Sequence, residues 1–260
     1  MTEEMSSLSE MKDFVTSLAR GLTVIQAFDK DHSKLTLTDV AKRTELNRAT
    51  ARRFLFTLNA LGYVESDGKL FWLSPKILEL GYAYLASQPI VDTVQPFIER
   101  VSNETGESCS VSVIDGNDVV YIARYFTHHI MSVTLNVGTR LPAFVTSMGR
   151  MLLAYKTDEE ASEILSNTQL KKFTEHTLVD RDQIKEQLKI VRSQGYSIVN
   201  QELEFGLRSI AVPIFNQRGT CVAAINVGTQ AGRIGEDELI ERILPSLQRA
   251  ANDIREILPS

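Results

Sequence analysis

Basic side chains between residues 34 and 72 have the types and spacing that recognition of DNA requires. Arg48, Arg52 and Arg53 follow one another on a segment whose opposite side is apolar. An arginine can donate two hydrogen bonds to one guanine, and the first turns of a helix in the major groove reach base edges. This stretch holds seven Lys and Arg against four Asp and Glu, a net charge of +3, whereas the whole chain of 260 residues carries −5. A small basic segment in an acidic chain favours selective DNA binding over general coating of nucleic acid.

Two helices and a hairpin are needed to hold these arginines, and the sequence predicts all three. Thr36, with Asp39 three residues later, forms a capping box for a helix over 37–44. Asn47 caps a second helix that runs to about residue 61, in which apolar residues recur at steps of three and four. Asp67 and Gly68 lie between two extended segments and predict a hairpin. This order is that of a winged helix-turn-helix; the alternative is a helical hairpin with a solvated basic face.

The residues expected to contact DNA lie at the two caps, along the polar side of the second helix and at the hairpin tip. They are Thr36, Asn47, Arg48, Ala49, Thr50, Arg52, Arg53 and Lys69. The helix residues would reach base edges, and the hairpin tip would reach the adjacent backbone or minor groove.

A second group of residues could bind an anion. Thr146, Ser147, Met148 and Gly149 lie where a loop is expected to turn into a helix. The first backbone N–H groups of a helix have no partner within it and can bind an anion. Four arginines could supply positive charge: Arg124, Arg140, Arg150 and Arg208. The alternative is an ordinary N-cap with arginines that only face solvent, and the sequence leaves both interpretations open.

Residue patterns for catalysis or metal binding are not found in the sequence. It holds no glycine-rich nucleotide loop, nucleophile elbow or paired-histidine zinc motif. His128 and His129 are neighbours in a strand-like segment, where adjacent side chains point to opposite faces, so they would not bind one metal together. Cys109 and Cys221 are expected to be small core residues, and Glu202 to line a sheet edge. We therefore predict no catalytic residue, no metal site and no enzyme.

A length of 260 residues suggests one large or two medium domains, and the composition is ordinary for a globular protein. The chain has no run of about 18 apolar residues, so it is not expected to span a membrane. Its first residues are polar and acidic, unlike a signal peptide, and its two cysteines form no disulfide framework, which predicts a cytoplasmic protein. We expect a disordered segment over 1–13, the winged helix-turn-helix over 14–73, a linker helix over 74–88 and a second domain over 89–260.

Hydrophobic patterning predicts the remaining elements. A helix over 14–28 is expected to turn Leu18, Leu22 and Ile25 toward the core. The linker helix is apolar on more than one side, which predicts packing against a partner subunit. In the second domain we expect helices at 90–105, from 147, at 158–165, at 181–194 and at 236–258, and strands at 109–115, 119–125, 131–137, 196–202, 207–215 and 221–227. The fold class is α+β, with helices layered on a mostly antiparallel sheet.

The chain resembles the IclR family of bacterial transcriptional regulators over nearly its whole length. The stretches that carry the resemblance are LTLTDVAKRTELNRATARRFLFTLNALGYV, GTRLPAFVTSMGRMLLAY and ELEFGLRSIAVPIFN. Within that family, ARYFTHHIMSV followed by GTRLPAFVTSMGR is similar to regulators of the protocatechuate branch of the β-ketoadipate pathway. The resemblance implies a C-terminal effector-binding and oligomerisation domain with a GAF-like fold. It also implies dimers through the DNA-binding domains and tetramers through the effector domains.

The resemblance also implies where an effector would bind. The matching positions are Ser147 and Met148, through their backbone N–H groups, and Val199, Leu207, Ser209, Asn226 and Gly228. To these we add Arg124, His128 and His129 as candidate charged groups. The family often has an acid or Ser where this chain has Val199, and Cys where it has Ser209. Close relatives in the subgroup tend to carry arginines where the two histidines stand.

These observations predict an effector-responsive, sequence-specific regulator of genes for aromatic acid catabolism. The effector would be a small aromatic or keto carboxylate such as protocatechuate or β-ketoadipate, and no cofactor is expected. The expected partners are a double-stranded, palindromic DNA operator, further copies of the chain as a homodimer or homotetramer, and RNA polymerase, but no membrane. One alternative is a constitutive DNA-binding repressor whose C-terminal domain only oligomerises. The other is an enzyme that acts on a small aromatic or keto acid.

Overall fold

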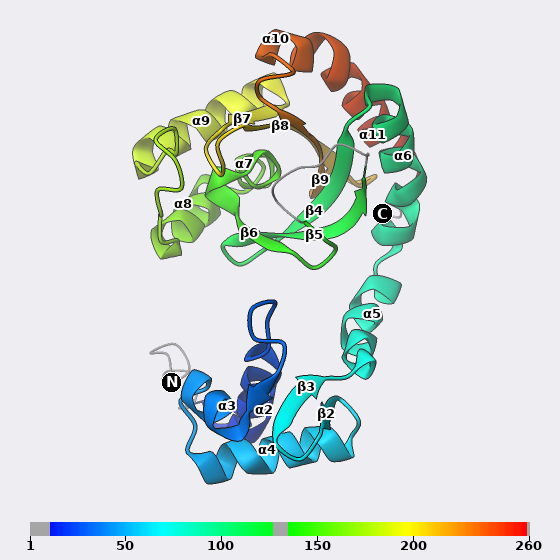
Figure 1. Ribbon diagram of the computed structural model, residues 1–260. Coiled ribbons are helices and arrows are strands. Elements are labelled where there is room, and N and C mark those ends of the chain that lie inside the picture. Colours follow the sequence, from blue (N-terminus) through cyan, green and yellow to red (C-terminus); the bar gives the residue numbers. More distant parts are fainter. Residues whose placement is uncertain (1–10, 127–134, 259–260) are drawn as a thin grey trace. The chain divides into compact units, whose positions relative to one another are not determined.

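The computed structural model describes residues 11–126 and 135–258 of the chain. By its internal contacts the chain divides into two compact units, Met1–Tyr84 and Leu85–Ser260 (Figure 1). None of the helices in the described ranges is long and apolar enough to cross a membrane.

The first unit is a winged helix-turn-helix, as the sequence predicts. Its elements are α2 (Thr16–Gln26), β1 (Leu35–Thr36), α3 (Leu37–Arg43), α4 (Arg48–Ala60), β2 (Val64–Ser66) and β3 (Leu70–Leu73). The capping box forms, because the Thr36 hydroxyl accepts from the Asp39 N–H at 3.2 Å and the Asp39 carboxylate accepts from the Thr36 N–H at 3.0 Å. The Asn47 side chain caps α4 by accepting from the Thr50 N–H at 2.8 Å. The short strand β1 pairs with β3 and completes a three-stranded antiparallel wing.

The predicted core face of the first helix is confirmed only in part, because Ile25 packs against the core of this unit whereas Leu18 and Leu22 do not. Leu18 and Leu22 are 64% and 47% exposed, whereas Val24 is fully buried. The helix instead turns its glycine toward α4, since a Cβ built on Gly21 would lie 3.7 Å from the Phe54 ring. Apolar residues occupy more than one side of α2, so periodicity alone could not choose the buried side.

A linker follows the wing as η1 (Pro75–Ile77) and α5 (Leu78–Ser87). No residue of α5 is buried in the described chain, although the helix is rich in apolar side chains. Leu78 and Tyr82 are 71% and 70% exposed.

The second unit is built on one antiparallel sheet. In the described ranges its helices are α6 (Pro89–Thr105), η2 (Ala143–Val145), α7 (Ser147–Ala154), α8 (Asp158–Asn167), α9 (Arg181–Gln194), α10 (Glu236–Glu238), η3 (Leu239–Ile243) and α11 (Leu244–Ile257). Its strands are β4 (Ser108–Asp115), β5 (Asp118–Tyr125), β6 (Arg140–Pro142), β7 (Ser197–Asn200), β8 (Leu207–Phe215) and β9 (Cys221–Gln230). The strand order is β6-β5-β4-β9-β8-β7. Figure 1 shows the sheet curling around α7.

Side-chain alternation on the central strands gives the sheet two different faces. On β4, Cys109 and Val111 pack in a core shared with α6 and α11. Ser108, Ser110 and Ser112, which alternate with them, are therefore turned to the other face, where α7, α8 and α9 form a second core with the sheet. This second face becomes polar toward one end of the strands, and that end holds a cavity.

Two predicted elements need correction. The strand expected at 131–137 falls largely outside the described residues, and positions 135–137 are not in a strand. On the side away from β4, β5 pairs with β6. The strand expected at 196–202 ends at Asn200, because Gln201 has a left-handed backbone (φ 57°) that breaks the extended pairing. The predicted final helix begins as α10, continues through the π-helical turn η3 and becomes the regular helix α11, which has Pro245 in its first turn.

Candidate DNA-binding helix and ligand cavity

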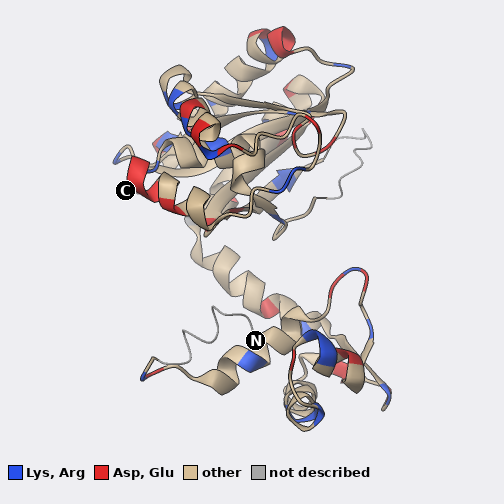
Figure 2. Cartoon of the chain, turned by 90° about the vertical axis from the view of Figure 1, so that its left-hand side faces the viewer, with Lys and Arg blue, Asp and Glu red and all other residues tan. Residues whose placement is uncertain are grey.

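The basic side chains of α4 are exposed and available for a partner. Arg48, Arg52 and Arg53 all face solvent, and none has an ion-pair or hydrogen-bond partner for its side chain within the described ranges. Arg43, at the end of α3, differs because its guanidinium bonds to the Ala27 carbonyl at 2.9 Å and to a carboxylate of the same unit. Helix α4, seen end-on near the bottom of Figure 2, carries arginine and no acidic residue. The charge on α4 is therefore free to meet an anionic surface.

A groove separates α4 from the wing. Among its lining residues are Arg48, Arg52 and Phe56, which follow one another at helical spacing along α4, and Lys69 at the wing tip. The Arg52 guanidinium stacks over the Phe56 ring at 5.0 Å from its centroid, which restrains the long side chain.

The predicted DNA-contact residues have different positions around this groove. Four of them line it: Thr36, Arg48, Arg52 and Lys69. Asn47 caps the helix, and Ala49 and Arg53 lie one residue further around its exposed side. Phe56 also lines the groove and is 54% exposed, but the sequence analysis did not include it among the residues expected to contact DNA.

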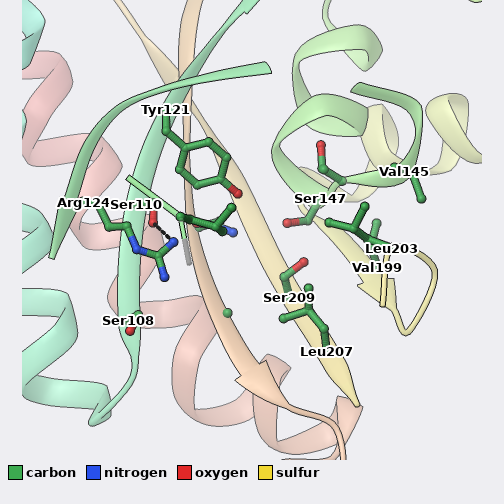
Figure 3. A pocket seen from close by; sticks show the side chains of 14 residues that line it. Ser108, Ser110, Tyr121, Arg124, Val145, Ser147, Val199, Leu203, Leu207 and Ser209 are labelled. Carbon is green, nitrogen blue, oxygen red and sulfur yellow. Dashed lines mark hydrogen bonds between the residues drawn. The ribbon is translucent and has the colours of Figure 1, made fainter. Parts of the chain in front are cut away.

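A cavity lies between the polar end of the sheet and the start of α7. Its lining residues are Ser108, Ser110, Tyr121, Arg124, Leu135, Val145, Thr146, Ser147, Val199, Leu203, Leu207, Ser209, Asn226 and Gly228. Figure 3 shows Arg124 joined to Ser110, with the hydroxyls of Tyr121, Ser147 and Ser209 directed into the space between the sheet and the helix. Among the described residues, this lining contains one cation and no acidic residue.

Strand register brings the polar lining residues together from four strands. One row across the sheet runs from Arg124 through Ser110 to Asn226. The next row runs from Ser108 through Gly228 to Ser209 and then to Val199. Residues directly opposite one another in antiparallel strands share a face, so both rows present their side chains to the cavity.

A β-bulge gives Arg124 its direction. The pairing of β4 with β5 shifts between Val111 and Ser112, so that Ser110 pairs with Arg124 but Ser112 pairs with Tyr121. Two residues at an odd separation point to opposite faces of a regular strand, and one inserted residue cancels this difference. Because of the bulge, Tyr121 and Arg124 both line the cavity.

The opposite wall of the cavity is the N-terminus of α7. The Thr146 hydroxyl accepts from the Gly149 N–H at 3.1 Å, which caps the helix. The N–H groups of Ser147 and Met148 precede the first intrahelical hydrogen bond, and the Ser147 hydroxyl is buried without a partner in the described chain. Backbone donors of this kind at the start of a helix can bind an anion.

A close approach of the backbone fixes this helix start. A Cβ on Gly149 would lie 2.1 Å from the carbonyl oxygen of Ala143 in η2. No other residue type fits there without moving the backbone, since side-chain atoms do not approach so closely. Gly149 is thus required to hold η2 against the first turn of α7.

Arg124 is the charged group of the cavity. Its guanidinium donates to the Ser110 hydroxyl at 3.3 Å and stacks 4.7 Å from the centroid of the Phe126 ring. Its Nε is buried without an acceptor, and no carboxylate of the described residues lies within ion-pair distance. Burial lowers the pKa of Arg124 from its usual value, because the charged form loses solvation. The cavity therefore holds a cation that has no charged partner within the described chain.

The other three candidate arginines are committed elsewhere. Arg140 pairs with Asp115 at 2.6 Å on the surface, and Arg150 forms a buried ion pair with Glu202 at 2.6 Å. Arg208 donates mainly to backbone carbonyl groups. None of the three lines the cavity. The same contacts correct the expectation for Glu202, which is buried in this pair and does not line a solvated sheet edge.

The structure brings most of the predicted effector residues to one place. Arg124, Ser147, Val199, Leu207, Ser209, Asn226 and Gly228 all line the cavity. The Met148 side chain is buried in the core, so only its backbone could contribute. His128 and His129 lie outside the described residues. Lining residues that the sequence analysis did not assign are Ser108, Ser110, Tyr121, Leu135, Val145 and Leu203.

The described residues give no support for a nucleophile or a metal centre. No three His, Cys, Asp or Glu side chains in these ranges are placed to hold a metal ion. Burial raises the pKa of the Cys109 thiol far above its usual value and that of Cys221 to about 12, so neither is a reactive thiolate.

An exposed arginine-bearing helix in a winged helix-turn-helix, with a second unit that encloses a cationic cavity, defines a ligand-sensing DNA-binding protein. Comparison with known proteins gives the family. The model of the IclR helix-turn-helix domain matches residues 17–68, and that of the bacterial transcriptional regulator IclR C-terminal domain matches residues 82–256. The chain belongs to the IclR family of bacterial transcriptional regulators. It is a regulator and not an enzyme, which confirms the prediction from the sequence.

Individual relatives agree with this assignment. The Pca regulon regulatory protein of Pseudomonas putida is 47% identical over 243 residues, which cover 93% of this chain and 84% of that protein. A crystal structure of a protein from Rhodococcus sp. RHA1 matches with a TM-score of 0.84 and 47% identity, over 94% of this chain and 98% of that one. An IclR homologue from Microbacterium hydrocarbonoxydans, crystallised with 4-hydroxybenzoate, matches with a TM-score of 0.80 and 26% identity, over 93% and 98% of the two chains.

Proposed function

We propose that this protein regulates genes for the breakdown of aromatic acids and that a small carboxylate binds its cavity as the effector. Protocatechuate and β-ketoadipate are the first candidates, given the similarity to a Pca regulon regulator and to a homologue that binds 4-hydroxybenzoate. The observation that carries the proposal is the Arg124 guanidinium, which has no carboxylate partner among the described residues and lines a cavity bordered by the N-terminus of α7.

The physical argument rests on how a buried carboxylate is stabilised. Removing a carboxylate from water is costly unless charged or polar donors replace the solvent. Arg124 supplies a positive charge, and the backbone N–H groups of Ser147 and Met148 supply oriented donors. Tyr121 and Asn226 can serve the other oxygen atoms of the ligand. Burial raises the pKa of Tyr121 to about 12, so its hydroxyl stays a neutral donor over the physiological range.

The DNA-binding part of the proposal rests on α4. We infer that Arg48 and Arg52 read base edges in the major groove and that Lys69 on the wing contacts the backbone beside it. The exposed apolar side chains of α5 support a homodimer, and further association of the effector domains would give a tetramer. A dimer would read a palindromic operator, with RNA polymerase as the downstream partner in the cytoplasm.

One experiment tests the sensing function directly. Purified protein is heated with protocatechuate, 4-hydroxybenzoate, β-ketoadipate and, as controls, benzamide and benzyl alcohol. A ligand that binds only the native state raises the melting temperature by mass action, about 2.7 kcal/mol of added stability at a concentration of 100 Kd. The same acid should then change the affinity for operator DNA in a gel-shift titration. If no acid shifts the melting temperature and none changes DNA affinity, the protein is a constitutive DNA binder and the effector proposal fails.

A further inference from the structure

Arg150 and Glu202 form an ion pair that lies outside the cavity yet joins the two segments forming one of its walls. The two residues are only 2% and 7% exposed. The guanidinium donates to both carboxylate oxygens, at 2.6 Å each, so the pair has the bidentate geometry that fixes the relative orientation of two groups.

The arginine end of the pair holds the start of α7. Arg150 lies one turn after Ser147, and its Nε donates to the Phe144 carbonyl in η2 at 2.9 Å. Gly149 allows η2 to approach this turn closely, and Arg150 then ties the two segments together. Val145 of η2 and Ser147 of α7 both line the cavity. The guanidinium therefore sets the direction of the helix N-terminus that faces a ligand.

The glutamate end holds the loop between β7 and β8. Glu202 Oε2 also accepts from the Leu178 N–H at 3.0 Å, and its carbonyl accepts from the Thr177 hydroxyl at 2.6 Å. The next residue, Leu203, lines the cavity, as do Val199 and Leu207 at the two ends of the same loop. The Glu202 carboxylate, which does not line the cavity itself, thus fixes the loop that contributes Leu203 to the cavity wall.

We propose that Arg150 and Glu202 are positioning residues for effector binding, a role that rests on the function proposed above. A buried ion pair is weak evidence for stability, because its desolvation offsets much of the attraction, and apolar residues of similar volume often replace it without loss. Apolar residues cannot reproduce the two parallel hydrogen bonds, which fix the position of the segment that holds Ser147 relative to the segment that holds Leu203. The pair acts on the ligand through these two segments and does not touch it.

The test compares wild type with the double variant Arg150→Met/Glu202→Leu. We expect its melting temperature and its operator affinity without effector to stay close to wild type. Its affinity for protocatechuate, measured by calorimetry, should fall by about tenfold or more, because a loosened supporting contact misplaces the donors. Amide hydrogen exchange without ligand should become faster in residues 143–149 and 201–206 and stay unchanged in α6 and α11. Arg150→Lys keeps the charge but loses the two parallel donors of the guanidinium, so its melting temperature should stay close to that of wild type while its affinity for protocatechuate falls.

Arg140→Met is the control, since it breaks an ion pair with Asp115 on the surface and should leave affinity unchanged. Wild-type affinity together with unchanged exchange in the double variant would overturn the positioning role. If wild-type protein binds none of the three acids, the proposed function fails, while the exchange measurement still tests the pair. Should the double variant not fold, exchange in Arg150→Lys and Glu202→Gln decides: protection equal to wild type in both segments would refute the proposal.

Discussion

Replacing Arg124 by methionine tests the electrostatic role of the cavity most directly. Methionine keeps much of the length of the side chain and removes its charge and all of its donors. A hydrogen bond to a charged group contributes about 1.5–3 kcal/mol, which corresponds to a loss of affinity of about 10- to 150-fold. We expect the Kd for protocatechuate or β-ketoadipate, measured by calorimetry at fixed salt, to rise within this range. Arg124→Lys should lose less, because it retains the charge but not the planar donors.

The same substitution should affect stability in the opposite direction. The guanidinium of Arg124 has a buried Nε without an acceptor and no carboxylate partner among the described residues. Its lowered pKa reflects the loss of solvation on burial, so the charged side chain weakens the ligand-free fold at neutral pH. We expect the melting temperature of ligand-free Arg124→Met to equal or exceed that of wild type. A structural role for Arg124 would instead lower it.

Arg140→Met provides the control for charge. Arg140 is a cation of the same domain but pairs with Asp115 on the surface and does not line the cavity. Its removal should leave the Kd unchanged. Retention of wild-type affinity by Arg124→Met, for every acid that binds the parent protein, would refute the assignment of Arg124 as the anchor of the carboxylate.

Three further predictions concern DNA, assembly and pH. Arg52→Ala should weaken specific operator binding by about 1–3 kcal/mol per half-site in a gel-shift titration at fixed salt, whereas the exposed control Arg218→Ala should not; equal affinities would exclude α4 as the reading helix. Light scattering should give a dimer or larger of the 29.1 kDa chain, and Leu78→Glu should shift it toward the monomer; a monomeric wild type would contradict the role of α5. If His128 or His129 supplies positive charge, affinity for an anion should fall as the pH rises from about 6 to 8, because the imidazolium is lost; a flat profile would leave Arg124 and the backbone as the anchors.

Local features of the fold could be predicted because the residues that decide them are close in sequence. Thr36 with Asp39, and Asn47 with the Thr50 N–H, form their caps within four residues. The helix-turn-helix follows from such contacts and from apolar periodicity. The same holds for the start of α7, where Thr146 caps the helix.

The cavity could be predicted only in part, because its geometry depends on contacts between distant segments. Regular alternation would place Tyr121 and Arg124 on opposite faces, and only the bulge opposite Ser112 brings them together. The close approach of Gly149 to Ala143 is likewise a packing result, since nothing in the local sequence demands it. The alternating serines on β4 indicate a polar face of the sheet. Only the register with β9, however, places Ser108 beside Gly228 and Ser110 beside Asn226.

The ion-pair partners of the arginines could not be predicted either, because they are distant in sequence. These partners distinguish Arg150 from Arg124, which the sequence analysis treated alike. Arg150 and Glu202 are 52 residues apart, and their pairing removes both from any direct role in binding an anion. Arg124 meets no acid in the described chain, so an anionic ligand that enters the cavity would offset part of the free energy lost by burying its charge. A folded protein that retains such a cation is less stable without its ligand than it could be. The unpaired arginine therefore links effector binding to the stability of this domain, whereas the paired arginine shapes the site in which that binding takes place.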